Sequence, residues 1–398
     1  RRIMNPSWGG KLTGTLGKAS FGILSAGDEW PGQSWETGAN PDEGKQAFFG
    51  VVRGKYSLGK DNYIGLLYSG REFAGQYNRV TGADLGYRLF KDHKINVSFL
   101  QSDSEEGEND QAGGDDLQGK SVHFMYSYIT EPLLVQTTFE HIGAGFKMDS
   151  AYLKRTGIDQ SVLKVEYSFF PKSGKQSWLK RISPGLQFNY LHDLETKLND
   201  SIVEFSLGFN FIGMGNLRLA YNVMKESWLG DTFDLNLFRL TGGIQVTKWL
   251  EIAGDLSIGD SIYYEAEPAY KGKANNGSLS LTFQPNRNIN QQFQFFYAHL
   301  SKDKKEIYDL NIYYSRTTYQ FSKYFFLRGI VQYDNFQKRL LTDFLASFTL
   351  IPGTVFHAGY GSLYEGREWR NNDWVLRRGD LIHFKRSFFL KVSYLWRF

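Results

Sequence analysis

The densest group of candidate metal ligands in the sequence is an acidic run at residues 103–110 (DSEEGEND), continued by Asp115 and Asp116. Clustered carboxylates can bind Ca²⁺, but the run lacks the ligand spacing and the final bidentate Glu of an EF-hand loop. We therefore interpret it as a solvated external loop.

Histidine is the next candidate for metal or catalytic chemistry. His123, His141, His357 and His383 are scattered singly, with no pair at metal-ligand spacing, and cysteine is absent. No Gly-X-Ser-X-Gly elbow, phosphate loop or His-Glu-X-X-His motif is present, and nothing brings a Ser and a His together. The sequence therefore predicts a protein that is not an enzyme, with no catalytic residue, no cofactor and no metal site.

The remaining polar chemistry lies in charged residues within otherwise alternating segments. A charge that faces hydrocarbon costs several kcal/mol, so these side chains are expected to face water. The two signs are balanced, which predicts little ion selectivity. The residues predicted to line an aqueous lumen are Arg53, Asp84, Arg88, Glu204, Arg218, Arg239, Glu251, Asp255, Asp309, Arg328, Asp343 and Lys391.

The segments that carry these charges alternate with a period of two, which is typical of strands whose two faces meet different surroundings. Clear examples are residues 203–211, 278–284, 308–315 and 343–350. Aromatic residues concentrate in the apolar register, as in the interfacial girdles of membrane barrels. The residues predicted to contact lipid are Phe205, Leu207, Phe209, Leu281, Phe283, Leu310, Ile312, Phe344 and Phe348.

Composition agrees with a membrane barrel rather than a helical membrane protein. The 398 residues are 41% hydrophobic and 16% aromatic, yet the mean hydropathy is -0.41. No apolar run approaches the roughly 20 residues that a membrane-spanning helix needs. The net charge of +4 lacks the concentrated basic patch that nucleic acid would require. We predict that residues 1–398 form one all-β, antiparallel transmembrane β-barrel of about 20–22 strands. A soluble β-sandwich or propeller is the alternative.

Connection lengths predict the orientation of this barrel. Outer-membrane barrels have short periplasmic turns and longer extracellular loops, so a periplasmic C-terminus is expected. A count of 21 strands would place Arg1 outside, so either one strand is miscounted or an upstream segment enters the wall or lumen first. Short turns are predicted at residues 17–18, 59–61, 91–93, 131–132, 212–215, 247–248, 322–323 and 351–353, and longer links at 30–45, 103–117, 143–157, 264–275 and 366–381.

The chain ends on an alternating strand whose apolar register includes Tyr394, Trp396 and Phe398. A terminal aromatic of this kind resembles the signal that outer-membrane barrels present to the barrel assembly machinery. We expect that deleting Phe398 reduces the amount of folded, heat-modifiable protein in outer membranes but leaves refolding in detergent nearly intact. Equal loss in both assays would show a structural role instead.

Three segments carry a resemblance to a family. Residues 9–14 with 20–24, residues 143–157, and the closing strand 389–398 resemble outer-membrane barrels of unknown function that follow a carbohydrate-binding family-9-like domain. The resemblance implies an upstream periplasmic domain that is missing from this chain. Its motifs are structural glycines and aromatics, so they specify architecture far better than activity.

The expected function is a pore or gated conduit for solutes, glycans among them, in a Gram-negative outer membrane. Outer-membrane lipid and lipopolysaccharide surround it, and an upstream domain or a periplasmic partner plugs the lumen, because an open hole of this strand number would breach the membrane. The alternative is a scaffold subunit without transport. An outer-membrane enzyme is a distant third.

Overall fold

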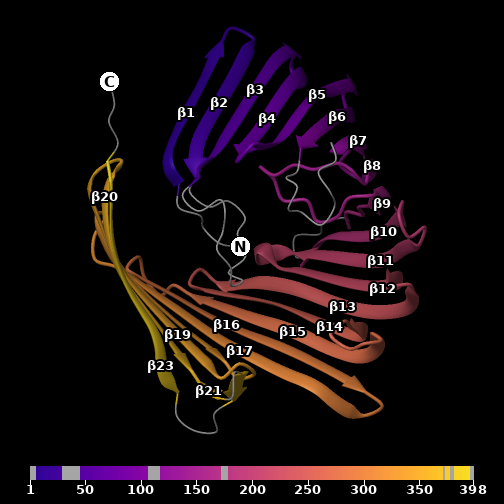
Figure 1. Ribbon diagram of the computed structural model, residues 1–398. Coiled ribbons are helices and arrows are strands. Elements are labelled where there is room, and N and C mark those ends of the chain that lie inside the picture. The colour runs from indigo at the N-terminus through magenta and orange to yellow at the C-terminus, as the bar shows by residue number, and fades with distance from the viewer. Residues whose placement is uncertain are drawn as a thin grey trace. The chain divides into compact units, whose positions relative to one another are not determined.

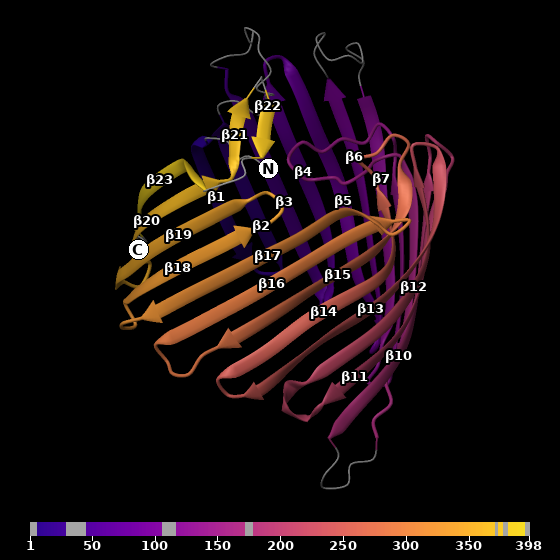
Figure 2. The ribbon, with the colours of Figure 1, turned by 90° about the horizontal axis from the view of Figure 1, so that it is seen from below.

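One large antiparallel sheet makes up almost the whole structure. The computed structural model describes residues 6–28, 45–105, 117–171, 178–370, 373–376 and 381–394. Within them a single sheet holds 21 strands, and β21 (Arg367–Arg370) pairs with β22 (Asp373–Leu376) in a separate hairpin (Figures 1 and 2). The predicted all-β class and strand number are thus confirmed. No helix in this part of the chain is long and apolar enough to cross a membrane.

The strands fall into two compact units. Unit 1 comprises Arg1–Ser168, Gly185–Val203 and Met224–Thr232, and unit 2 comprises Phe169–Pro184, Glu204–Val223 and Phe233–Phe398. Successive strands pair antiparallel along each unit. Unit 1 contains β1 (Pro6–Leu16), β2 (Ala19–Asp28), β3 (Ala47–Gly59), β4 (Asn62–Phe73), β5 (Gln76–Phe90), β6 (His93–Glu105), β7 (Leu117–Ile129), β8 (Leu133–Ile142) and β9 (Ile158–Tyr167).

Both units share the strands in the middle of the chain, and unit 2 holds those that follow. The shared strands are β10 (Leu179–Asp193), β11 (Asn199–Phe211), β12 (Asn216–Trp228) and β13 (Asp231–Thr247), with the short 3-10 turn η1 (Ile212–Met214). Unit 2 continues with β14 (Leu250–Tyr263), β15 (Tyr270–Phe283), β16 (Ile289–Lys302), β17 (Lys305–Gln320), β18 (Phe325–Asp334), β19 (Arg339–Ile351), β20 (Thr354–Glu365) and β23 (Ile382–Ser393).

The register separates a polar face from an apolar face in unit 1. Residues directly opposite each other in paired strands lie on the same face of a sheet. Asp84 of β5 begins one such row, which continues to Gln160 of β9 through Ser98, His123 and Glu140. The alternate register carries exposed apolar side chains, listed here with their exposed fractions: Val52 44%, Ile64 47%, Leu66 65%, Phe99 43%, Phe139 41% and Leu163 42%.

Unit 2 shows the same division. A largely polar row runs from Glu251 through Thr282, Gln292 and Arg316. It reaches Asp343 by way of Ile330. The alternate register pairs Ile252 with Leu281 and Leu281 with Phe293. We call these two surfaces the polar face and the apolar face of each unit.

Three connections differ from the predicted alternation of short turns and long links. β4–β5, β12–β13 and β16–β17 are joined by two-residue turns at Ala74-Gly75, Leu229-Gly230 and Asp303-Lys304, on the strand ends where longer links were expected. All six residues have positive φ, as tight hairpin turns require. The predicted alternation of short turns and longer links therefore breaks at these three hairpins, none of which is among the longer links predicted above.

Candidate functional site

Most of the residues predicted to line a lumen lie on the polar face. In unit 1 the register places three of them there, and in unit 2 six. The unit 1 residues are Arg53, Asp84 and Arg88, and those of unit 2 are Arg239, Glu251, Asp255, Arg328, Asp343 and Lys391.

Arg53 and Asp84 form an ion pair that spans an intervening strand. Arg53 lies on β3 and Asp84 on β5, and their side chains meet over Gly65 of β4, with Nη2 to Oδ2 at 2.7 Å and Nη1 to Oδ1 at 2.5 Å. A Cβ added at Gly65 would lie 2.6 Å from both Arg53 Nη2 and Asp84 Oδ1. The missing side chain of Gly65 is therefore what lets the pair form.

Glu204 of β11 and Arg218 of β12 are also paired, as are Arg328 of β18 and Asp343 of β19. Arg218 donates to Glu204 at 2.7 Å and to Ser206 at 2.9 Å. Arg328 approaches Asp343 at 3.8 Å. The sheet thus neutralises much of its own charge across neighbouring strands, which keeps these groups hydrated or paired instead of facing hydrocarbon.

Several predicted residues lie elsewhere than expected. Asp309 shares its face with Tyr313, which pairs with Phe295 on the apolar face, so its predicted place on the polar face is wrong. Leu310 and Ile312, which were predicted to contact lipid, lie on the polar face. β17 is 16 residues long and extends beyond the roughly 10 residues that cross the hydrocarbon, so polar residues near its end face water on either side.

Other predicted residues fall partly outside the described ranges. Trp396 and Phe398 of the predicted assembly signal lie there, whereas Tyr394 is described and exposed. Most of the acidic run, residues 106–116, also lies outside.

The connection between β8 and β9 was predicted only as a longer link, but it folds back onto the polar face. We call residues 143–157 the strap. Figure 1 shows this coil beside β5 to β8, on the inner side of their curve. It crosses the polar face of β4–β7, all within unit 1.

Polar contacts fix the strap to three strands. Asp149 accepts a hydrogen bond from Arg71 Nη1 of β4 at 2.8 Å, and its backbone N–H donates to Asn78 Oδ1 of β5 at 2.9 Å. Asn78 Nδ2 donates to the carbonyl of Lys147 at 3.0 Å, and the backbone N–H of Lys147 donates to Ser102 Oγ of β6 at 3.1 Å. The strap backbone thus uses side chains of the sheet as its partners, as a buried segment must.

An apolar cluster lies under the strap. Phe146 is 3% exposed and packs with Val80, Ile142 and Ile158, and Leu100 and Met148 contact the same group. Val80 is completely buried although it lies on the polar face. Small residues make room, because a Cβ at Gly119 would lie 2.1 Å from the backbone nitrogen of Phe146.

The C-terminal end of the strap is held by Arg155. Its guanidinium contacts Asp193 at 2.5 Å and Asp200 at 3.4 Å. Asp193 also accepts backbone hydrogen bonds from Glu195 and Thr196. The strap then enters β9 through Gly157, whose φ of 67° suits glycine.

A cavity of about 480 Å³ opens beside the strap. Its walls are formed almost entirely by the strap itself, with a mixed set of polar and apolar side chains that includes Lys147, Met148, Asp149, Tyr152 and Leu153. A cavity of this kind can hold water or a polar solute against the polar face of unit 1. It contains no group of catalytic residues.

Comparison with known proteins concerns the fold. No protein-family model matches the sequence, and none of the curated proteins matches it. Solved structures are similar: the copper transporter OprC (TM-score 0.61, 10% identity, 98% of this chain and 79% of that chain) and the siderophore receptor PiuA from Acinetobacter baumannii (0.53, 11%, 96% and 78%). A mutant of the ferric enterobactin receptor PfeA from Pseudomonas aeruginosa has a TM-score of 0.59 at 8% identity, over 94% and 72% of the two chains. The chain therefore has the fold of an antiparallel outer-membrane β-barrel.

Proposed function

We propose that the chain is an outer-membrane conduit for solutes, narrowed from within by the strap. The strap carries this proposal, because fifteen consecutive residues are fixed across the polar face by Arg71, Asn78 and Ser102. A loop with no role in passage would be expected to leave the face free. A loop that constricts or gates the interior must instead be held there.

Two further observations support transport. The polar face carries charges that require water or partners, which suits an aqueous interior. Structures with the same fold serve as a copper transporter and as siderophore receptors. A plug or a periplasmic partner that fills the rest of the interior is part of the proposal, as is a periplasmic C-terminus.

The solute class follows from the charge balance. Ion pairs such as Arg53–Asp84 and Arg328–Asp343 place charges of both signs side by side on the described polar face. We therefore propose uncharged polar solutes, glycans among them, rather than small ions of one sign.

A scaffold subunit without transport is the second candidate. The same ion pairs favour it, because they tie neighbouring strands into a stiff wall. Conductance of the purified protein in planar bilayers distinguishes the two candidates.

Substituting Asp149→Asn tests the role of the strap. A hydrogen bond to a charged group contributes about 1.5–3 kcal/mol, so the strap should open at least about tenfold more often. We expect a larger conductance and faster tryptic cleavage at Lys147 and Lys154. The matched control is Glu72→Gln, which breaks the exposed Glu72–Arg79 pair of the β4–β5 hairpin, where the two side chains lie in the apolar-face register and away from the strap.

The outcomes separate the two candidates. Increased conductance in Asp149→Asn, with Glu72→Gln unchanged, supports a conduit. Faster cleavage of the strap in a barrel that conducts in neither form would overturn transport and favour the scaffold.

A further inference from the structure

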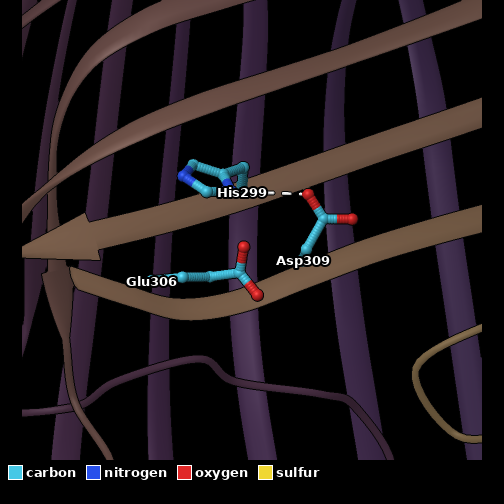
Figure 3. A group of neighbouring side chains, drawn as sticks. All are labelled: His299, Glu306 and Asp309. Atoms are coloured by element: carbon cyan, nitrogen blue, oxygen red, sulfur yellow. Dashed lines mark ion pairs between the residues drawn. The ribbon is translucent and has the colours of Figure 1, made fainter. Parts of the chain in front are cut away.

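A second group of side chains lies near the tip of the β16–β17 hairpin in unit 2. His299 of β16 lies beside Glu306 and Asp309 of β17 (Figure 3). One ligand atom from each residue lies within 4.8 Å of the others. His299 Nδ1 is 3.4 Å from Asp309 Oδ2.

A β-bulge brings the third residue to the group. His299 and Asp309 are direct cross-strand partners, and Ser301 lies opposite Glu306. The register shifts between these two pairs, so that β17 has one residue more than β16 there. Without that extra residue, Glu306 and Asp309 would point to opposite faces of the strand. The bulge therefore turns Glu306 onto the face of Asp309.

The imidazole of His299 is available as a ligand. Its Nδ1 is buried and makes no hydrogen bond to any described residue, although a carboxylate lies close by. The paired strands β8 and β9 offer a direct contrast. There His141 Nδ1 and Asp159 Oδ1, again cross-strand partners, are joined by a 2.6 Å hydrogen bond. The His299–Asp309 pair thus lacks the hydrogen bond that joins His141 to Asp159.

Neighbouring groups orient the carboxylate and the ring. Asn311 Nδ2 donates to Asp309 Oδ1 at 2.6 Å, and the backbone N–H of Asn311 donates to Asn335 Oδ1 at 2.6 Å. The ring of Tyr297 stacks on His299, with centroids 6.4 Å apart and planes 13° from parallel. Support of this kind around the ligands is characteristic of metal sites.

The charge of the group also suits a divalent cation. Two carboxylates facing the apolar side would be costly in hydrocarbon, so this end of the hairpin must extend beyond it. Lys302 does not neutralise them, because it lies on the opposite face, over the ring of Tyr270 at 3.9 Å. With a neutral imidazole, the two carboxylates balance one M²⁺ ion.

We propose that His299, Glu306 and Asp309 bind one divalent transition-metal ion of the zinc type. Imidazole favours zinc and its neighbours over calcium and magnesium, which prefer oxygen ligands alone. Three protein ligands leave at least one coordination position for water or an external group. The ion would close the hairpin tip across the bulge.

Calorimetric titration of the untagged, EDTA-treated chain in detergent with Zn²⁺ tests the site. We expect one zinc per chain, and a loss of at least about tenfold in affinity in His299→Ala and in Glu306→Gln. His141→Ala is the matched control and should bind zinc like the wild type. Heat-modifiable mobility in gels verifies that each variant is folded. Glu306 is exposed, so its variant decides the result if His299→Ala fails to fold.

Three results would overturn the proposal. Zinc affinity could be unchanged in Glu306→Gln. The loss could be equally large in His141→Ala, which would place binding elsewhere. Calcium or magnesium could bind as tightly as zinc, which would point to a simple acidic site. None of these measurements depends on conductance, so this inference and the proposed conduit stand or fall separately.

Discussion

Gly119→Val is expected to expel the strap from the polar face of unit 1. The added Cβ would lie 2.1 Å from the backbone nitrogen of Phe146 and 2.2 Å from its Cα, and backbone cannot yield as a flexible side chain can. Overpacking a tight site typically costs about 1–3 kcal/mol. Here the strap can relieve the clash by moving away, which exposes Phe146. Conductance and tryptic cleavage of the strap should both rise, as they are expected to in Asp149→Asn.

The matched control for this change is Gly54→Val. Gly54 is a strand glycine of β3 with nothing within 4 Å of an added Cβ, in the register of the apolar side chains Val52 and Tyr56. It should fold and conduct like the wild type. If Gly119→Val leaves the strap protected from trypsin, the strap is not seated against β7 as the structure has it.

Arginine substitutions at Leu281 and Ile312 are expected to have opposite outcomes. Leu281 lies on the apolar face between Ile252 and Phe293, where an Arg near the membrane midplane costs about 2–4 kcal/mol. Ile312 lies on the polar face opposite Asp334, which can pair with the new charge. Leu281→Arg should therefore unfold at clearly lower denaturant concentration in lipid vesicles, whereas Ile312→Arg should shift little.

The neighbouring residue checks the face assignment of β17. Tyr313 is 52% exposed on the apolar face, so Tyr313→Arg should resemble Leu281→Arg. Strong destabilisation by Ile312→Arg with tolerance of Tyr313→Arg would restore the register that the sequence predicts.

The strands could be predicted because the two faces of each strand meet different surroundings, one polar and one apolar. Leu279, Leu281 and Phe283 alternate with serine and threonine, and the structure places them on one face as expected. This alternation is a local property, so it survives without any knowledge of neighbouring strands.

Prediction failed where the surroundings change along a single strand. In β17 both registers contain apolar residues, Leu310 and Ile312 in one and Tyr313 in the other. Asp309 and Asn311 share the face of Tyr313, in the half of β17 that begins at Lys305. Their polarity made that face look like the one that lines the lumen. The strap was missed for a different reason: its partners, Arg71 and Asn78, are about 70 residues away, and no short-range pattern encodes such contacts. The bulge that turns Glu306 is equally invisible in a period of two.

The glycine between Arg53 and Asp84 has a consequence for how the wall can assemble. A slip of one residue in β4 would exchange its two faces. It would be unfavourable because apolar side chains would then face water and polar ones would face lipid. A slip of two residues preserves every inside–outside assignment, so hydrophobicity alone cannot detect it. That slip would insert Tyr63 or Leu67 between the two charges in place of Gly65, since these are its neighbours on the same face. The Arg53–Asp84 ion pair therefore selects one register of β4 between β3 and β5. It disfavours the two-residue slip, which burial of apolar side chains in the membrane would not prevent.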